Sequence, residues 1–125
     1  MAKILVIDDD GIQRRILDKA LTLAHHDVIE AKDGKEGVRR FRAEQPDLVV
    51  CDIVMPNQEG IETICEMRES APDIPIIAIS GVGTGVGLSY LDIAQKLGAT
   101  SGLAKPFRPA ELVALVNRLL GATGE

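Results

Sequence analysis

Four short runs of aliphatic residues in this chain each end on a residue with reactive chemistry. The four junctions are Ile7–Asp8, Cys51–Asp52, Ile79–Ser80 and Ala104–Lys105. Uninterrupted runs of Val, Ile and Leu are typical of parallel strands that are buried on both faces of a sheet. Because the carboxyl ends of parallel strands share one edge of a sheet, where ligands bind, these side chains are expected to converge on one site.

Between the apolar runs, hydrophobic residues recur at helical spacing, so the pattern predicts alternating strands and helices. We predict strands near 3–8, 26–31, 47–52, 74–80 and 100–104, and helices near 12–24, 34–44, 59–70, 87–97 and 109–120. Strand 26–31 is the least apolar and is expected at an edge. The alternation indicates an α/β fold: a five-stranded parallel sheet with helices on both faces. Residues 1–121 are predicted to form one domain, followed by a short tail at 122–125.

The pattern also predicts local detail at the helix ends and on the first helix. The residues expected on its buried stripe are Ile12, Ile16, Leu17, Ala20 and Leu21, and those expected outside are Arg14, Arg15, Asp18 and Lys19. Asp10 is expected to cap the first helix, and Asp33 with Glu36 has the spacing of a capping box. Gly121 is expected just past the last helix, and His26 at an exposed helix terminus.

Composition excludes several classes of partner. The formal net charge is −5 and the pI is near 5.0, which argues against direct binding to nucleic acid or to an anionic membrane. No apolar run is long enough to span a bilayer, and the polar start Met1-Ala2-Lys3 does not resemble a signal peptide. A cytoplasmic location is therefore expected.

The residues at the strand ends suit phosphoryl transfer beside a divalent cation. An aspartate such as Asp52 can act as a nucleophile toward phosphorus, and Asp8, Asp9 and Asp52 together supply the oxygen ligands that Mg²⁺ prefers. The charge of Lys105 would balance phosphoryl oxygens, and Ser80 would donate a hydrogen bond to one of them. Taken singly, each residue is readily explained as a cap, a turn or a solvated side chain. Their joint occurrence favours a site, because three crowded carboxylates repel one another without a cation.

Five segments carry a resemblance to a known family. They are Ile4-Leu5-Val6-Ile7-Asp8-Asp9-Asp10, Asp52-Ile53-Val54-Met55-Pro56, Glu59-Gly60, Ile79-Ser80-Gly81 and Lys105-Pro106-Phe107. Over about residues 3–120 the chain resembles the receiver domain of two-component response regulators, the CheY-like fold. The resemblance implies the sheet order 2-1-3-4-5 of flavodoxin-like proteins.

The resemblance also implies a role for each matching residue. By motif position, Asp52 resembles the phosphoacceptor. Asp9 resembles the acid that binds Mg²⁺ directly, Asp8 its partner through water, and the carbonyl of Val54 the third protein ligand. A cis peptide is implied before Pro106.

Two further roles and the partners follow from the same resemblance. Ser80 takes the place of the hydroxyl residue that senses the phosphoryl group, and Lys105 that of the lysine that pairs with it. The implied phosphodonor is a histidine kinase or a phosphotransfer protein. The implied output is a downstream protein partner or a fused effector. The chemistry is self-modification, so the chain is not expected to be an enzyme acting on free substrates.

The chain departs from the family pattern at two places. Three residues before its lysine the family usually has Tyr or Phe, and this chain has Gly102. Output is therefore hypothesised to use a shift around 81–89 in place of an aromatic rotamer. The glycine-rich stretch 81–87 matches no phosphate-binding fingerprint, so it is not expected to bind phosphate as a P-loop does. It is expected to be a long, mobile loop beside the site.

Other functions stay open at this point. One is a receiver-like interaction domain whose output does not depend on phosphate, which Gly102 leaves open. Another is a phosphatase with an Asp nucleophile, although Val54 stands where such enzymes place a second acid. A flavin-binding module is weaker still. Whether the chain is free-standing or part of a larger regulator is also open.

Overall fold

The fold alternates strands and helices along the whole chain. The computed structural model describes residues 2–53, 59–80 and 85–123, with the backbone alone at 59, 85–90, 122 and 123. The strands are β1 (Lys3–Ile7), β2 (Asp27–Ala31), β3 (Leu48–Asp52), β4 (Ile76–Ser80) and β5 (Ser101–Ala104). The helices are α1 (Gly11–Leu23), α2 (Gly34–Glu44), α3 (Glu59–Ser70), α4 (Gly85–Leu97) and α5 (Pro109–Thr123).

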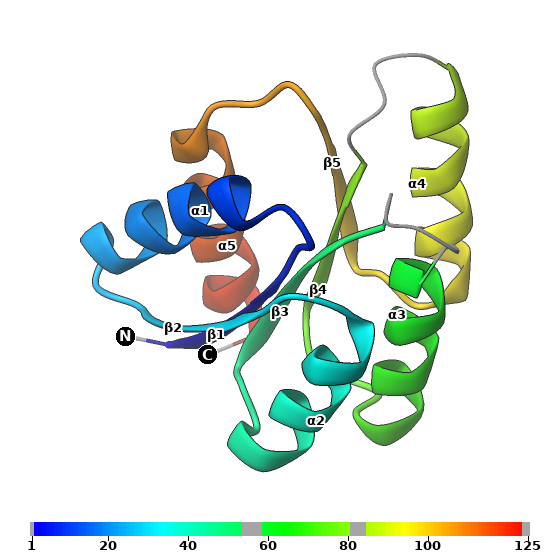
Figure 1. The fold of residues 1–125 in the computed structure, drawn as a ribbon, viewed down its shortest axis with the longest axis horizontal. Coiled ribbons are helices and arrows are strands. Elements are labelled where there is room, and N and C mark those ends of the chain that lie inside the picture. The colour runs from blue at the N-terminus through cyan, green and yellow to red at the C-terminus, as the bar shows by residue number, and fades with distance from the viewer. Residues whose placement is uncertain (1, 54–58, 81–84, 124–125) are drawn as a thin grey trace.

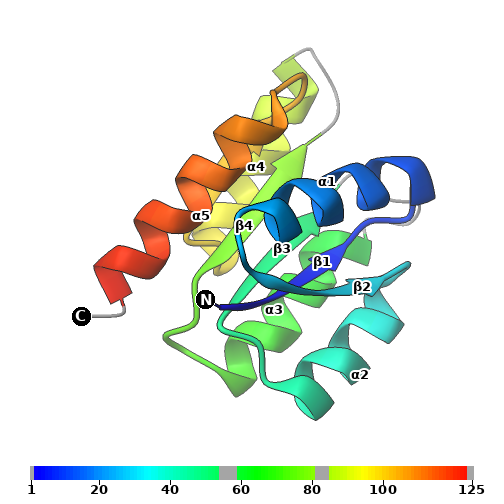
Figure 2. The same ribbon diagram turned by 90° about the vertical axis from the view of Figure 1, so that its left-hand side faces the viewer.

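The five strands form one parallel sheet in the order β2-β1-β3-β4-β5. Helices α1 and α5 cover one face, and α2, α3 and α4 cover the other (Figure 1). Strand β2 lies at one edge, beside β1 (Figure 2). The predicted fold class, sheet order and edge position of β2 are therefore confirmed.

Alternate residues of each central strand feed two separate apolar layers. On β1, Leu5 and Ile7 join the layer under α2, α3 and α4, whereas Ile4 and Val6 join the layer under α1 and α5. All four side chains are fully buried. Each such burial stabilises the fold by about 1.5–3 kcal/mol. This two-sided burial explains why the strands read as continuous apolar runs.

Side chains cap the helices that begin near the site. Asp10 accepts hydrogen bonds from the backbone N–H groups of Ile12 and Gln13 and so begins α1. Asp33 accepts from the backbone N–H of Glu36 at 2.8 Å and begins α2. Both predicted caps are confirmed.

The predicted buried face of α1 is partly wrong. Leu17 and Leu21 are buried, but Ile12 is 76% exposed and Ile16 is 45% exposed. Arg14, predicted to face solvent, has only 18% of its side chain exposed. Periodicity marks an apolar stripe, but it does not fix which side of the helix faces the sheet. In the folded protein the side that carries Arg14 faces β2, and Arg14 forms polar contacts between α1 and β2.

Three local predictions need correction. Helix α4 begins at Gly85, two residues before its predicted start, and α5 continues to Thr123, so Gly121 lies inside it. Tertiary context here overrides the low helix propensity of glycine. His26 is buried, with Nδ1 accepting from the backbone N–H of Ala2 and Nε2 at 2.9 Å from the side-chain oxygen of Asn117. Of the loop predicted at 81–87, residues 85–87 belong to α4, and residues 81–84 lie outside the described residues. The domain boundary at 121 stays a prediction.

Gly60 allows the first turn of α3 to press against the end of β3. A Cβ at Gly60 would fall 2.5 Å from the Cα of Ile53 and in direct collision with the carbonyl oxygen of Asp52. Only a residue without a side chain permits this approach of two backbone segments. The close packing helps to hold Asp52 at the strand end.

We expect Gly60→Ala to destabilise the protein by about 2–3 kcal/mol, because backbone atoms cannot move aside as a flexible side chain would. The matched control is Gly121→Ala, also in a helix, where a Cβ meets nothing within 4 Å. That change should raise the stability by about 0.5 kcal/mol. Urea unfolding of both variants measures the difference, and equal effects would contradict the packing argument.

Candidate functional site

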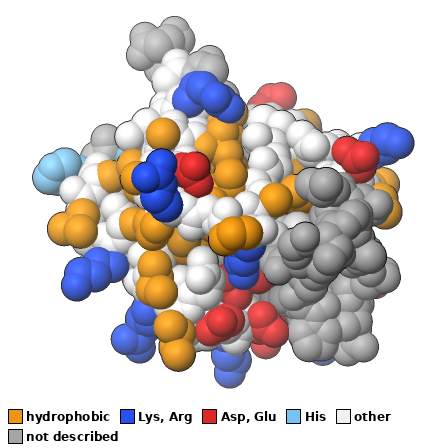
Figure 3. All heavy atoms as spheres, turned by 90° about the horizontal axis from the view of Figure 1, so that it is seen from above, with side chains coloured by type: hydrophobic (Ala, Val, Ile, Leu, Met, Phe, Trp, Pro, Cys, Tyr) orange, Lys and Arg blue, Asp and Glu red, His pale blue; other side chains and the backbone are white. Residues whose placement is uncertain are grey.

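Three carboxylates meet at the carboxyl ends of the central strands β1 and β3. One oxygen from each of Asp8, Asp9 and Asp52 lies within 4.8 Å of the others. Asp8 and Asp52 are buried, while Asp9 is exposed. Seen from this end of the sheet, acidic side chains gather beside a basic one (Figure 3). The convergence predicted from the four junctions is therefore present for these three residues.

Lys105 contacts the cluster, and Ser80 lies beside it at the end of the neighbouring strand β4. The Nζ of Lys105 lies 3.3 Å from Oδ2 of Asp52. The backbone N–H of Lys105 donates to the carbonyl oxygen of Ser80 at 2.8 Å, which ties the end of β5 to the end of β4. The Oγ of Ser80 is buried without a hydrogen-bond partner in the described part of the chain. A hydroxyl of this kind is ready to donate to an incoming oxygen.

The pKa of Asp8 is shifted by its surroundings. Its Oδ1 accepts a hydrogen bond from the backbone N–H of Asp10 at 2.9 Å, while its buried Oδ2 has no partner among the described residues. Burial, with smaller contributions from the charges of Asp52 and Asp9, raises the pKa of Asp8 from an ordinary 3.8 to about 6. The Asp10 N–H and Lys105 act in the opposite direction but do not cancel these effects.

The geometry and chemistry of this cluster fit a hard divalent cation. The three acids offer oxygen ligands, which Mg²⁺ prefers, and the buried Oδ2 of Asp8, without a hydrogen-bond partner among the described residues, could coordinate the cation or accept a hydrogen bond from its water. A cation would also offset the burial and the repulsion that together raise the pKa of Asp8.

Comparison with known proteins agrees with this geometry. The family model described as the response regulator receiver domain matches residues 4–117. This chain belongs to that family. The receiver domain is 40% identical over 118 residues to the probable transcriptional regulator ycf27 of Porphyridium aerugineum, covering 94% of this chain and 48% of that protein. It thus spans about half the length of this curated relative.

A second relative and a solved structure match over nearly their full lengths. The receiver domain is 33% identical to the chemotaxis protein CheY of Thermotoga maritima, covering 94% of this chain and 96% of that protein. The crystal structure of a response regulator receiver domain protein from Clostridium thermocellum matches with a TM-score of 0.90 and 28% identity, covering 99% and 98% of the two chains. Receiver domains of response regulators are signalling domains, which agrees with the predicted class of function.

Some predicted features lie outside the described residues of the receiver domain. Val54, whose carbonyl is predicted to bind metal, is one of them, and the segment 81–84 is another. The peptide between Lys105 and Pro106 is cis, as the resemblance implies. Within the described residues, we find no helix whose length and hydropathy would suit it to cross a bilayer.

Gly102 of this receiver domain packs against a leucine of α4. A Cβ at Gly102 would lie 3.1 Å from Cδ2 of Leu91, so Leu91 would have to shift slightly to admit any side chain there. Leu91 is 8% exposed and joins the apolar layer on its face of the sheet. The space beside Gly102 is therefore occupied by a residue from another element.

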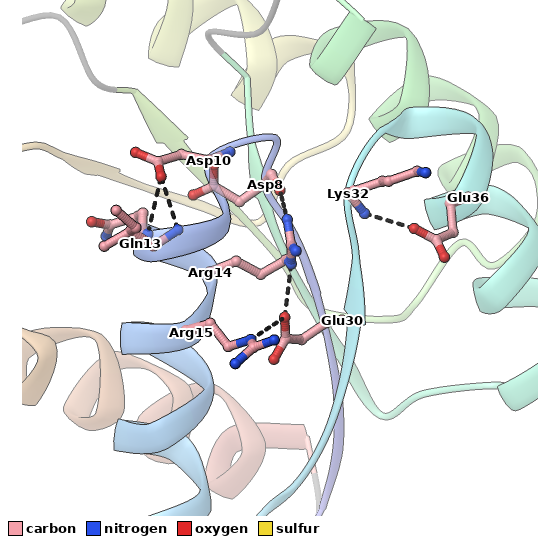
Figure 4. Close-up of polar contacts among 9 residues, drawn as sticks. Asp8, Asp10, Gln13, Arg14, Arg15, Glu30, Lys32 and Glu36 are labelled. Atoms are coloured by element: carbon pink, nitrogen blue, oxygen red, sulfur yellow. Dashed lines mark hydrogen bonds and ion pairs between the residues drawn. The ribbon is translucent and has the colours of Figure 1, made fainter.

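The structure also adds two residues that the pattern did not single out. Arg14 lies between the carbonyl oxygen of Asp8 and the carboxylate of Glu30 (Figure 4). Glu30 lies on β2, one residue before Ala31, whose carbonyl accepts from the backbone N–H of Asp8 at 3.1 Å. Neither residue belongs to a motif. Only the packing of α1 beside β2 brings them to the site.

We expect Asp8→Asn to stabilise the metal-free protein by an amount that rises with pH. Because the pKa of Asp8 is about 6 in the folded protein and 3.8 is its ordinary value, ionisation increasingly disfavours the folded state as pH rises from 3.8 to about 6, and the effect levels off above that. The gain should be about 3 kcal/mol at about pH 7.5 and about 1 kcal/mol at about pH 4.5.

Urea unfolding in a chelating buffer at the two pH values measures this gain. Asp33→Asn is the control, since Asp33 caps α2 and is not one of the three clustered carboxylates. A gain for Asp8→Asn that does not change with pH would contradict the assignment.

Proposed function

We propose that this receiver domain accepts a phosphoryl group on Asp52 in the presence of Mg²⁺ and then changes how it binds a partner. The observation that carries the proposal is the buried Asp52 carboxylate, which lies 3.3 Å from the ammonium of Lys105 and within one cluster with Asp8 and Asp9. Both the acceptor and the charges needed around a phosphoryl group are thus present.

In the proposed reaction, a carboxylate oxygen of Asp52 forms a bond to phosphorus as the bond from phosphorus to the donor breaks. The donor keeps the electron pair of that bond and takes up a proton. Mg²⁺, bound by Asp8, Asp9 and Asp52 and by the carbonyl of Val54, would neutralise charge on the transferring group. Lys105 balances the charge of the remaining phosphoryl oxygens.

Ser80 completes the proposed site. Its buried hydroxyl has no hydrogen-bond partner in the described residues, so it can donate to a phosphoryl oxygen. Such a new hydrogen bond would favour one arrangement of the β4 end over another. The path onward passes through the region near Gly102 and residues 81–89, and we propose a backbone shift there as the output.

The proposed phosphodonor is a histidine kinase or a phosphotransfer protein, as for response regulators in general. The similarity covers 48% of ycf27 but 96% of CheY, so the relatives include both longer proteins and proteins of about the length of this domain. We propose that this domain signals to a downstream protein partner or to a fused effector.

Incubation with Mg²⁺ and acetyl phosphate should add one phosphoryl group to the protein, seen by intact mass spectrometry. Asp52→Ala should abolish the adduct, because the nucleophile is lost. The control Asp47→Ala removes an exposed acid that lies away from the cluster and should leave the adduct unchanged. Absence of an adduct on the wild-type protein would instead favour the alternative, a domain whose output does not depend on phosphate.

We expect Mg²⁺ affinity to fall as pH decreases through about 6, because a protonated Asp8 is a poor ligand. Between about pH 7.5 and about pH 5 the affinity should fall by about tenfold. Isothermal titration calorimetry measures it directly. Asp8→Asn should bind weakly at both pH values, and a pH-independent affinity of the wild-type protein would contradict the role of Asp8.

A further inference from the structure

Asp8 is held by hydrogen bonds at every polar group except one. Its backbone N–H donates to the carbonyl oxygen of Ala31, and its Oδ1 accepts from the backbone N–H of Asp10. Its carbonyl oxygen accepts from Nη1 of Arg14 at 2.8 Å. Only Oδ2 has no partner among the described residues. The surroundings of Asp8 therefore leave one carboxylate oxygen available.

Arg14 supplies the one side-chain contact in that set, and it is itself anchored. Its Nε lies 2.7 Å from Oε1 of Glu30, and the two side chains are only 18% and 23% exposed. The guanidinium uses two different N–H groups for its two partners, a division that its planar fork allows and that a lysine ammonium reproduces poorly. Figure 4 shows Arg14 between the two partners.

Glu30, which anchors Arg14, belongs to the edge strand β2. This strand is linked to Asp8 in two ways, once directly and once through Arg14. Glu30 pairs in register with Val6 of β1, two residues before Asp8. Its neighbour Ala31 accepts the Asp8 N–H through its backbone, and Glu30 reaches the Asp8 carbonyl through Arg14. Both the N–H and the carbonyl of Asp8 are thus fixed to β2.

We propose that Arg14 is a positioning residue that, anchored by Glu30, fixes the turn after β1 so that Oδ2 of Asp8 faces the cation site. Arg14 acts on the backbone of Asp8 and does not touch the cation or the phosphoryl group. The inference rests on the proposed function, because its readout is Mg²⁺ affinity. Partners that orient a ligand in this way typically change metal affinity by about tenfold or more.

A purely structural ion pair would have different consequences. If Arg14 only linked α1 to β2, its loss would lower stability while the surviving protein bound Mg²⁺ as before. If it positions Asp8, Mg²⁺ affinity falls in folded protein, below the unfolding temperature. Stability and affinity therefore have to be measured on the same samples.

The test compares Arg14→Ala, Arg14→Lys and Glu30→Gln in the full chain, with Arg15→Ala as the matched control. Arg15 is the next residue, carries the same charge, and is 80% exposed with its Nε 3.9 Å from the same Glu30 oxygen. Calorimetry measures Mg²⁺ binding to the unphosphorylated protein, and circular dichroism measures thermal unfolding in a chelating buffer.

Arg14→Ala should weaken Mg²⁺ binding by about tenfold, and Glu30→Gln and Arg14→Lys by about threefold, because each keeps part of the linkage. Arg15→Ala should stay within about twofold of the wild type. With acetyl phosphate, Arg14→Ala should raise the Mg²⁺ concentration for half-maximal phosphorylation and leave the rate at saturating Mg²⁺ close to that of the wild type.

The proposal is overturned if folded Arg14→Ala binds Mg²⁺ as tightly as the wild type, whatever its melting temperature. If Arg14→Ala does not fold, the Mg²⁺ affinities of Glu30→Gln and Arg14→Lys test the proposal in its place. The proposal is overturned if both variants bind Mg²⁺ as tightly as the wild type. Failure of the wild-type protein to bind Mg²⁺ or to accept phosphate is a separate result, because it rejects the proposed function itself.

Discussion

Three carboxylates held together at the carboxyl ends of the central strands impose the main constraint on this receiver domain. Asp8 and Asp52 are buried and Asp9 adjoins them, so their charges repel in a place that water screens poorly. The raised pKa of Asp8 is the direct result of that burial and repulsion. A cluster of this kind lowers stability in the absence of a cation, which is typical of sites shaped for function. The contacts of Asp8 with the Asp10 N–H and with the charge of Lys105 reduce this loss of stability but do not cancel it.

The rest of the structure supplies what this cluster requires. The two apolar layers on either side of the sheet provide the stability that offsets the crowded acids. Gly60 brings the start of α3 against the carbonyl of Asp52, and the N–H of Asp10 and the ammonium of Lys105 offset part of the negative charge. Strand β2, although at the edge, is tied to Asp8 through Ala31 and, by way of Arg14, through Glu30. An edge strand with few neighbours thus helps to position a residue of a central strand.

The family's usual switch residue is replaced by a tight contact between two elements. Gly102 lies on β5, opposite Ala78 of β4, and Leu91 of α4 packs against it. Because interiors are close-packed, the output that we propose could pass from the end of β4 to α4 through such a contact, without an aromatic rotamer. The contact gives the proposed output through the backbone a physical basis in the described residues.

Much of the fold and of the site follows from local sequence. Continuous aliphatic runs at Ile4, Leu48 and Ile76 mark strands buried on both sides, and each run ends on a residue of the predicted site. The caps at Asp10 and Asp33 could also be predicted, because a cap depends on neighbours within a few positions.

What depends on packing between elements could not be predicted in this way. The exposure of Ile12, the burial of His26 and the contacts of Arg14 all depend on how α1 docks against β2 and α5. Periodicity defines a stripe on a helix but not the rotation at which tertiary packing presents it. Sequence alone thus determined which chemical groups stand at the strand ends. Only the tertiary structure decided how far Asp8 is buried and which residues form hydrogen bonds to it, because both depend on contacts between segments that are far apart in the sequence.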